Sequence, residues 1–309
     1  MKDITIIGGG PAGMTAAVYT ARKKLDLQMV AHDLGGQASW SWSVENYMGF
    51  SYIKGIDLMH RFEEHMRQFK FEVDYSIVTH VRKEGDHFIV GREGDEETAT
   101  RSVIVASGKS PRHLDVPGED RLIGRGISYC ATCDAPIFKG MDVVVVGGGN
   151  SALTSAIQLL SYARNIGIIS YEDWTGDPVL QDQLTTEQNV NIFKYSEITE
   201  IIGEHMVSAV RVRNRRSGEE TFIPVRGVFV EIGQVPNSGL VKDLVSLNRR
   251  GEIMINCDCT TSVPGLFAAG DVTNIPEKQI IIAAGEGAKA ALAAYKYLIG
   301  HQWEEKKAA

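Results

Sequence analysis

One glycine-rich turn occurs twice in the chain, and this repetition constrains the fold more than any other feature. Each copy stands between a short β-rich run and a helical stretch: residues 8–13 follow the run 4–7, and residues 147–152 follow the run 143–146. In such a unit the first glycine permits a tight turn, the second lets backbone approach a pyrophosphate, and the third small residue lets helix pack on strand. The helix N-terminus favours the negative charge. The sequence therefore predicts two dinucleotide-binding units.

Candidate binding residues follow from positions within and after each turn. In the first unit they are Gly8, Gly10, Pro11, Ala12 and Gly13, and in the second Gly147, Gly149, Asn150 and Ser151, with Ala152 as the third small residue. An acid about 20 residues after the turn is expected to hydrogen-bond a ribose. Asp33 and Glu172 stand at those positions. A solvated loop acid explains Glu172 equally well.

The domain organisation follows from the same repeat. A chain of 309 residues is long enough for two domains, and turn-rich, charged segments at 111–117 and 244–251 separate the apolar runs. We expect an α/β protein with two Rossmann-like three-layer dinucleotide-binding domains, the second inserted into the first. The first would comprise residues 1–113 and 245–309, and the second residues 114–244. Late strands at 253–255 and 266–269 would return to the first sheet, before a helix at 279–298.

The four cysteines form two close pairs, Cys130 with Cys133 and Cys257 with Cys259. They are too few and too clustered for a secreted disulfide framework. A two-residue spacer lets Cys130 and Cys133 form a redox-active disulfide, and the adjacent Asp134 can tune thiolate formation and proton delivery. Zinc is the alternative, but it needs the second pair, which has one spacer residue and no nearby histidine. For Cys257 and Cys259 buried, inert thiols on one strand face are expected.

Several classes of function are disfavoured by simple properties of the chain. Its start leads directly into an apolar strand without a leader pattern, and no run of about 18 uncharged apolar residues occurs, so we expect a cytoplasmic protein without membrane spans. The net charge of −7 argues against general nucleic-acid binding, which needs a basic face.

The ordered motifs resemble those of low-molecular-weight thioredoxin reductases of the bacterial and archaeal type, over nearly the whole chain. Besides the two fingerprints, the matching segments are Gly35-Gly36-Gln37, Glu45-Asn46-Tyr47, Ala106-Ser107-Gly108, Cys130-Ala131-Thr132-Cys133-Asp134, Gly233 to Asn237 and Thr261 through Gly270-Asp271. The resemblance implies a flavoprotein disulfide oxidoreductase that forms a homodimer and reduces thioredoxin or a thioredoxin-like protein.

The same resemblance implies roles for individual residues. FAD would lie in the first domain, with Gly36, Gln37, Asn46, Gly108 and Gly270 around it, Asp271 on its ribityl chain, and Gln279 and Ile280 at its pyrimidine edge. Cys133 would face the flavin and Cys130 would attack the partner disulfide. Asp134 would donate and accept the proton.

The chain departs from the family where NADPH is recognised. Members that use NADPH carry a His-Arg-Arg-x-x-x-Arg segment, whereas residues 168–177 contain no arginine and include Glu172, Asp173 and Asp177. A 2′-phosphate would be repelled there, so NADPH is disfavoured. NADH, with Glu172 on its ribose, and reduced ferredoxin remain. Ferredoxin is favoured, because nothing positive marks a nicotinamide site. An NADH-dependent reductase of a peroxiredoxin system and a non-catalytic flavin redox sensor are the alternative functions.

A ferredoxin is acidic and would need a basic docking face. Two clusters are candidates, one of Arg211, Arg213, Arg215 and Arg216 and the other of Arg22, Lys23 and Lys24. Solvated positions in a hairpin or at a helix end explain both clusters equally well. Trp40, Trp42 and Trp303 are candidates for stacking on a flavin, and core or interface packing is the simpler role for each.

Overall fold

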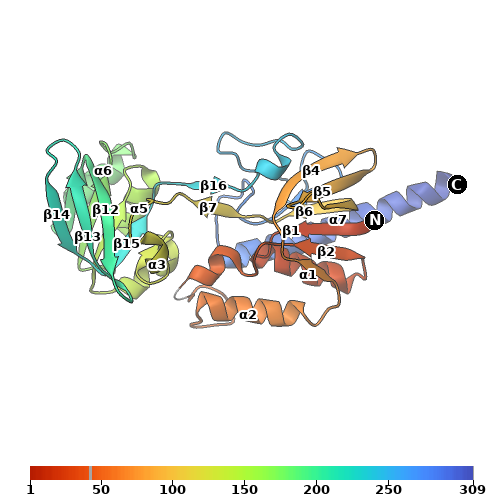
Figure 1. Ribbon diagram of the computed structural model, residues 1–309, viewed down its shortest axis with the longest axis horizontal. Helices are drawn as coiled ribbons and strands as arrows, with labels where there is room; N and C mark the ends of the chain where they lie inside the picture. Colours follow the sequence, from red (N-terminus) through yellow and green to blue (C-terminus); the bar gives the residue numbers. More distant parts are fainter. Residues whose placement is uncertain (42–43, 309) are drawn as a thin grey trace.

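The computed structural model describes residues 1–41 and 44–308, with side chains up to residue 300. It consists of two units arranged along the long axis of the molecule and joined by a narrow two-stranded connection (Figure 1). Each unit is built on its own sheet with a fingerprint turn at its first strand. The predicted α/β class with two dinucleotide-binding units is confirmed.

The first unit is built on a seven-stranded sheet in the order β3-β2-β1-β6-β5-β4, with β17 also paired to β6. Strands β1, β2, β3, β6 and β17 are parallel, whereas β4 and β5 extend the sheet as an antiparallel meander. Their bounds are β1 (Lys2–Ile7), β2 (Leu27–Val30), β3 (Glu72–Asp74), β4 (Val78–Glu84), β5 (His87–Arg92), β6 (Glu97–Val105) and β17 (Leu266–Ala268).

Alternating side chains divide the first unit into layers. Ile4 and Ile6 of β1 pack with the helices, while Ile7 packs with the meander on the opposite face. The elements on the helical face are α1 (Pro11–Arg22), η1 (Gly36–Trp40), α2 (Gly55–Met66) and α7 (Ile280–Ala308). Small residues allow close packing of α1 on α7, since a Cβ at Gly287 would lie 2.0 Å from the Ala12 carbonyl oxygen.

The second unit repeats this plan with a five-stranded parallel sheet, ordered β11-β10-β9-β15-β8. Val145 packs against helices on one face, and Val144 packs against a three-stranded antiparallel sheet on the other. The parallel strands are β8 (Ile127–Ser128), β9 (Asp142–Val146), β10 (Asn165–Ser170), β11 (Val190–Lys194) and β15 (Gly227–Val230), and the antiparallel ones β12 (Ser196–Gly203), β13 (Val207–Asn214) and β14 (Glu220–Pro224). The helices are α3 (Glu119–Leu122), α4 (Ala131–Asp134), η2 (Ala135–Phe138), α5 (Asn150–Leu159) and α6 (Pro178–Thr185).

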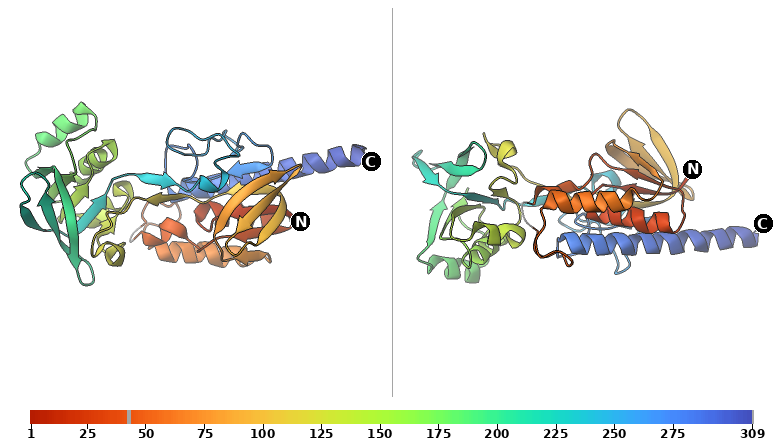
Figure 2. Two further views of the ribbon diagram at one scale, coloured as in Figure 1. Left: turned by 45° about the horizontal axis from the view of Figure 1, so that its top comes forward. Right: turned by 90° about the horizontal axis from the view of Figure 1, so that it is seen from below.

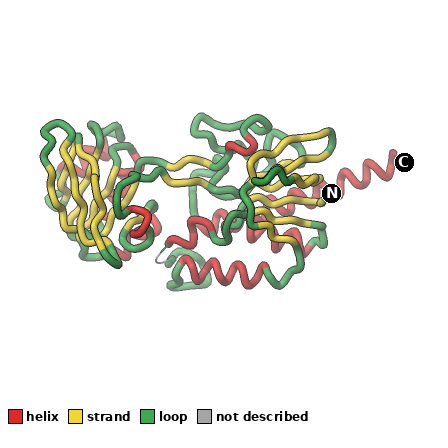
Figure 3. Tube along the Cα trace, in the orientation of Figure 1, coloured by secondary structure: helices red, strands yellow, loops and turns green. Residues whose placement is uncertain are grey.

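The connection between the units is a short antiparallel pair, β7 (Lys109–Pro111) and β16 (Gln234–Pro236) (Figure 3). The chain thus returns to the first unit before η3 (Gly239–Val241), and Val241 packs there in the cluster on the meander face. We propose that the inserted unit ends near Pro236, earlier than the boundary at 244/245 expected from turn residues, because Val241 and Val245 already pack in the core of the first unit.

The late elements differ from the prediction in detail. Residues 253–255 form no strand. Ile253 makes isolated β-bridges to Leu247 and Thr273. The Ile255 N–H donates to the Asn274 side chain, so it is not available to extend these bridges into a β-ladder. Helix α7 runs to Ala308, well beyond the predicted end at 298, and projects past the rest of the molecule (Figure 2). Among the described residues, no helix has the length and apolar character needed to span a bilayer.

Candidate functional site

A cavity of about 700 Å³ lies where the two units meet, and both contribute to its lining. Most of the predicted cofactor and redox residues line it: Gly8, Gly10, Pro11, Ala12, Asp33, Gly36, Gln37, Gly108, Cys130, Cys133, Asp134, Gly270, Asp271, Gln279 and Ile280. The volume falls in the range typical of cofactor sites. Residues scattered over the whole sequence are therefore brought together at one place.

The first fingerprint forms one wall of this cavity. Gly8 has a φ of +111°, and a Cβ there would lie 2.3 Å from the Ala106 carbonyl oxygen, so no other residue fits without strain. A Cβ on Gly13 would lie 1.9 Å from the Gly8 oxygen, which explains the close contact of helix and strand. Gly10, by contrast, faces open space within 4 Å. The turn therefore leaves room for a ligand at its middle glycine alone.

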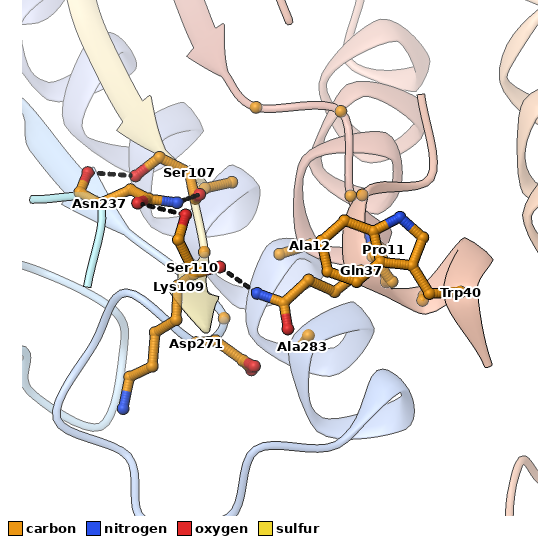
Figure 4. Close-up of a pocket in the computed structure, with 18 of the residues that line it drawn as sticks. Pro11, Ala12, Gln37, Trp40, Ser107, Lys109, Ser110, Asn237, Asp271 and Ala283 are labelled. Atoms are coloured by element: carbon orange, nitrogen blue, oxygen red, sulfur yellow. Dashed lines mark hydrogen bonds between the residues drawn. The ribbon is translucent and has the colours of Figure 1, made fainter. Parts of the chain in front are cut away.

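The opposite wall carries buried charges (Figure 4). Asp271 follows β17, and burial raises the pKa of its carboxyl, while the nearby ammonium groups of Lys278 and Lys109 act in the opposite direction. The Lys109 Nζ lies 2.6 Å from Glu252 Oε1. Neither lysine belongs to a recognisable motif, so neither was predicted from the sequence to lie at this site. Lys278 stands directly before the predicted Gln279, a position that could have pointed to it.

Side-chain hydrogen bonds hold the cavity rim. The Gln37 amide donates to the Lys109 carbonyl oxygen, as Figure 4 shows. The Asn46 amide donates to Gln279 Oε1 over 3.0 Å, so Asn46 acts on the cavity through a neighbour and does not line it. Trp40 lines the cavity. Trp42 and the side chain of Trp303 lie outside the described residues.

Cys130 and Cys133 are joined in a disulfide, which leaves neither sulfur free as a zinc ligand. Cys130 caps the short helix α4, and its Sγ accepts a hydrogen bond of 3.2 Å from the Cys133 backbone N–H. Both residues line the cavity that contains the first fingerprint, although they belong to the second unit. The disulfide thus faces the proposed cofactor position.

Asp134 lies beside the disulfide and is held by two serines. Ser128 Oγ donates to Asp134 Oδ2 over 2.6 Å, and Ser41 Oγ donates to Asp134 Oδ1 over 3.3 Å. Burial raises the pKa of Asp134 above its ordinary value, partly offset by these hydrogen bonds. Ser128 also accepts the Cys130 N–H at 3.1 Å, so it links the acid to the cysteine loop. Ser41 comes from the first unit, and its hydrogen bond crosses between the units.

The residues present fit a dinucleotide with a redox-active ring. The open space at Gly10 and at Gly108 admits a ligand against backbone. Asp33 lines the same cavity, and its side chain is 65% exposed. Its carboxylate is therefore available to accept a hydrogen bond from a ribose of a dinucleotide bound at the turn. At the other end of the cavity lies the disulfide. The first unit can therefore hold a flavin dinucleotide that extends from the fingerprint to the cysteines.

The second fingerprint lies apart from that cavity but has a similar turn. Its Gly148 carbonyl oxygen accepts the Thr175 N–H at 2.8 Å, just as the Gly9 oxygen accepts the Gly35 N–H at 2.8 Å in the first unit. Gly147 has a φ of +140°, and the nearest atom to a Cβ on Gly149 would be 3.9 Å away. The backbone cradle for a pyrophosphate is therefore intact in the second unit as well.

Two predicted residues of this second turn are already engaged or solvent-facing. Asn150 Oδ1 accepts the Asp177 N–H at 2.6 Å, which fixes the loop after β10 against the turn. Ser151 and Glu172 are exposed. Asp173 is paired with Lys194 at 2.7 Å, and hydrogen bonding to that lysine lowers the pKa of the carboxyl. Glu172 and Asp177 are thus exposed acids of the loop beside this turn.

The arginine cluster proposed as a docking face is largely neutralised. Arg211 pairs with Glu200 at 3.2 Å and Arg213 with Glu197 at 2.6 Å. Arg215 and Arg216 lie over the rings of Tyr171 and Tyr195, with their guanidinium carbons 3.4 and 3.3 Å from the ring centroids. The residues have structural partners, so the cluster does not present a uniform basic surface. In the other cluster, Lys23 lies over the Tyr295 ring.

Cys257 and Cys259 lie in a turn and not in a strand. Cys259 is buried with a φ of +66°, and burial raises the pKa of its thiol to about 12. Its Sγ lies 3.5 Å from the Glu286 carbonyl oxygen. Cys257 is exposed, and both thiols are free. The prediction that both cysteines lie on one face of a strand is therefore wrong, because the backbone turns between them. Cys259 is buried as expected, whereas Cys257 is not.

Comparisons with known proteins place the chain in a family. Residues 2–290 match the pyridine nucleotide-disulphide oxidoreductase family. Thioredoxin reductase from Streptococcus pyogenes superposes with a TM-score of 0.92 at 38% identity, covering 97% of this chain and 99% of that one. The Lactococcus lactis enzyme in its FR conformation gives a TM-score of 0.67 at 34% identity, with coverage of 97% and 100%.

Curated relatives include an alkyl hydroperoxide reductase component of Staphylococcus epidermidis, 40% identical over 299 residues. That match covers 96% of this chain, which spans 59% of the length of the relative. The protein therefore belongs to the pyridine nucleotide-disulphide oxidoreductase family and is a flavoprotein disulfide oxidoreductase of the thioredoxin reductase type. The resemblance identified from the motifs is confirmed.

Proposed function

We propose that this protein passes electrons from NADH through FAD and the Cys130–Cys133 disulfide to the disulfide of thioredoxin or a thioredoxin-like protein. The observation that carries the proposal is the position of the disulfide, which lines the same cavity as the first fingerprint although it belongs to the other unit. A bound flavin would supply a two-electron reductant at that disulfide.

The cysteines account for the partner reaction. Reduction of the disulfide takes up two electrons and two protons and gives two thiols. The Cys130 thiolate then attacks the partner disulfide and forms a mixed disulfide, and Cys133 attacks the Cys130 sulfur to release the reduced partner. The Cys130–Cys133 disulfide is thereby restored. By resemblance to the family, Cys133 is the sulfur on the flavin side.

Asp134 supplies and removes the protons that these steps require. Burial raises the pKa of its carboxyl, so the protonated form persists to higher pH than in a solvated aspartate. Ser128 orients it through a hydrogen bond of 2.6 Å and also holds the Cys130 backbone. The acid therefore stays beside the sulfurs when the second unit moves.

Access of a protein partner requires such a movement, because the disulfide faces the interior cavity in this structure. The two strands that link the units, β7 and β16, form a narrow connection that can act as a hinge (Figure 3). The lower superposition on the enzyme in its FR conformation, at similar identity and coverage, is what a different arrangement of two similar units would give.

NADH is the donor that the second unit supports best. Its pyrophosphate cradle reproduces the first fingerprint, and the exposed Glu172 can accept a hydrogen bond from a ribose 2′-hydroxyl. The same acid disfavours the 2′-phosphate of NADPH. For ferredoxin, which the sequence favoured, Arg211 and Arg213 of the main candidate face are paired with acids. These contacts shift the preference from ferredoxin to NADH.

Side-by-side rapid-mixing experiments test this assignment. The FAD-loaded enzyme is mixed anaerobically with NADH, NADPH or reduced ferredoxin, and bleaching of flavin absorbance is followed. We expect NADH to reduce the flavin fastest, and thioredoxin reduction to follow only when both cysteines are present. Faster reduction by NADPH or by ferredoxin would contradict the assigned donor. Thioredoxin reduction by a Cys133→Ser variant would contradict the route.

A further inference from the structure

A partly buried acid of the second unit, Glu231, lies outside every motif discussed above. It follows β15 at the carboxyl edge of the sheet, two residues before Gly233. Glu231 was not predicted from the sequence, because it is a single polar residue between a strand and a glycine. Its backbone also contacts the second fingerprint, since a Cβ on Gly147 would lie 2.5 Å from the Glu231 carbonyl oxygen.

The Glu231 carboxylate joins two helices. Ser155 Oγ of α5 donates to its Oε1 over 2.7 Å, and the backbone N–H of Ala131 in α4 donates to the same carboxylate. Ala131 directly follows Cys130, the residue that caps α4. A second hydrogen bond joins α4 to α5, in which Thr132 Oγ1 donates to Gln158 Oε1 over 3.2 Å. Glu231 is therefore connected to the redox disulfide through one peptide unit.

No other charge compensates this acid within the elements that pack around it. Helix α5 has no charged residue, and Asp134, the charged residue of α4, is bound to Ser128 and Ser41. Burial accordingly raises the pKa of Glu231 to about 7, against the effect of its two hydrogen bonds. The charge of this acid therefore changes near neutral pH.

We propose that Glu231 is a positioning residue of the redox centre, whose carboxyl group anchors the Cys130 loop to α5 and whose charge controls how readily Cys130 becomes a thiolate. When the disulfide has been reduced, a negative Glu231 opposes a second negative charge at Cys130 and a protonated one does not. The proposal refines the proposed function, because the thiolate of Cys130 is the attacking group there.

Alkylation of Cys130 tests the charge without donor, flavin turnover or partner. In a Cys133→Ser background the peptide 126–139, between Arg125 and Lys139, contains Cys130 as its single thiol, and the exposed Cys257 provides an internal reference in the same sample. Rates of reaction with iodoacetamide are measured by mass spectrometry from pH 5 to 9. E231Q keeps a hydrogen-bond acceptor and removes the charge.

We expect E231Q to raise the Cys130 alkylation rate about threefold to tenfold at pH 8, with little change at pH 5, where Glu231 is already protonated. The matched control is E197Q, at a partly buried carboxyl of β12 in the same unit that pairs with Arg213, and it should leave the profile unchanged. A profile of E231Q that superimposes on that of its parent, or an equal shift in E197Q, would overturn the role of the charge.

The anchoring role is tested separately in the two-cysteine enzyme. We expect E231A to lower kcat/KM for the disulfide partner about tenfold while E231Q stays within about threefold, because the amide can still accept the Ala131 N–H. An E231A enzyme that matches E231Q would overturn the anchor. If the protein reduced no thioredoxin-fold partner at all, the proposed function would fail, and the alkylation result would still stand.

Discussion

The two units of this enzyme share one plan but surround their fingerprints differently. In both, a parallel sheet lies between helices and an antiparallel layer, and the carbonyl of Gly9 or Gly148 in the turn accepts a backbone N–H at 2.8 Å. The first turn opens into a cavity lined by segments from both units. The second carries an exposed acidic loop. Under the proposed function, the same turn would hold a retained dinucleotide in one unit and an exchangeable one in the other.

The surroundings of the two turns thus differ more than the turns themselves. The first site is covered by the segments after β6 and β17 and by the start of α7, which come from far apart in the chain. The second unit contributes its disulfide to the cavity of the first unit, so the proposed flavin and the disulfide would be held by different units. Substitutions at equivalent positions should then have unequal consequences.

The largest expected effect is at the disulfide. Cys133→Ser or Cys130→Ser should lower reduction of a disulfide partner by at least about 10³-fold, because a single sulfur cannot alternate between dithiol and disulfide. Reduction of the flavin by NADH should remain. Coupled partner reduction and flavin bleaching, measured on the same preparation, separate the two. Parallel losses in both assays would show that the units do not divide the work as proposed.

Next in size is the effect of the acid beside the cysteines. Because burial raises the pKa of Asp134, its donating form is lost only as the pH rises through that raised value, and the proton-dependent step should slow over this range. D134N should lower turnover with the partner about 10²-fold and flatten this pH dependence. The measurement is kcat/KM between pH 5 and 9. An unchanged pH profile in D134N would contradict the assignment.

A matched pair of glycine substitutions compares the two turns directly. G8A and G147A each place a side chain at a positive φ and against a carbonyl oxygen, 2.3 Å away in one and 2.5 Å in the other. We expect G8A to weaken FAD retention at least about tenfold, whereas G147A should stay yellow and lose reduction by NADH to a similar extent. Thermal melting shows whether both variants are folded. Loss of flavin from G147A would break the comparison.

The smallest effect concerns the choice of nucleotide. E172R should raise the ratio of kcat/KM for NADPH over NADH about fivefold, since it replaces a repulsive charge near the ribose by an attractive one. E187R, at another exposed acid of the same unit, is the control and should change the ratio less than about twofold. If both variants gave the same ratio, Glu172 would have no role in discrimination.

Much of this architecture could be predicted from local patterns. The fingerprints, the disulfide pair and the segments Gly270-Asp271 and Gln279-Ile280 each consist of neighbouring residues, and their placement around one cavity follows from the family resemblance. The second boundary, expected at 244/245, is proposed to lie near Pro236, because packing of the residues after β16 is not visible in a local pattern. A strand was expected at the apolar residues 253–255, but the Ile255 N–H donates to the Asn274 side chain.

Contacts between distant segments were out of reach of the sequence. Ser41 meets Asp134 across the units, and Lys109 meets Glu252 across 143 positions. Glu231 acquires its importance from Ser155 and Ala131, neither of which is near it in the chain. Single polar residues such as these have no periodicity or motif, so they become recognisable only when the fold has placed their partners.

The central claim is that the disulfide of the second unit exchanges electrons with a flavin held by the first. An anaerobic reductive titration of the FAD-loaded enzyme with dithionite tests it most directly. The intact protein should take up four electrons per FAD, two for the flavin and two for the disulfide, while the Cys130→Ser/Cys133→Ser double variant takes up two. An intact enzyme that is fully reduced by two electrons would contradict this account.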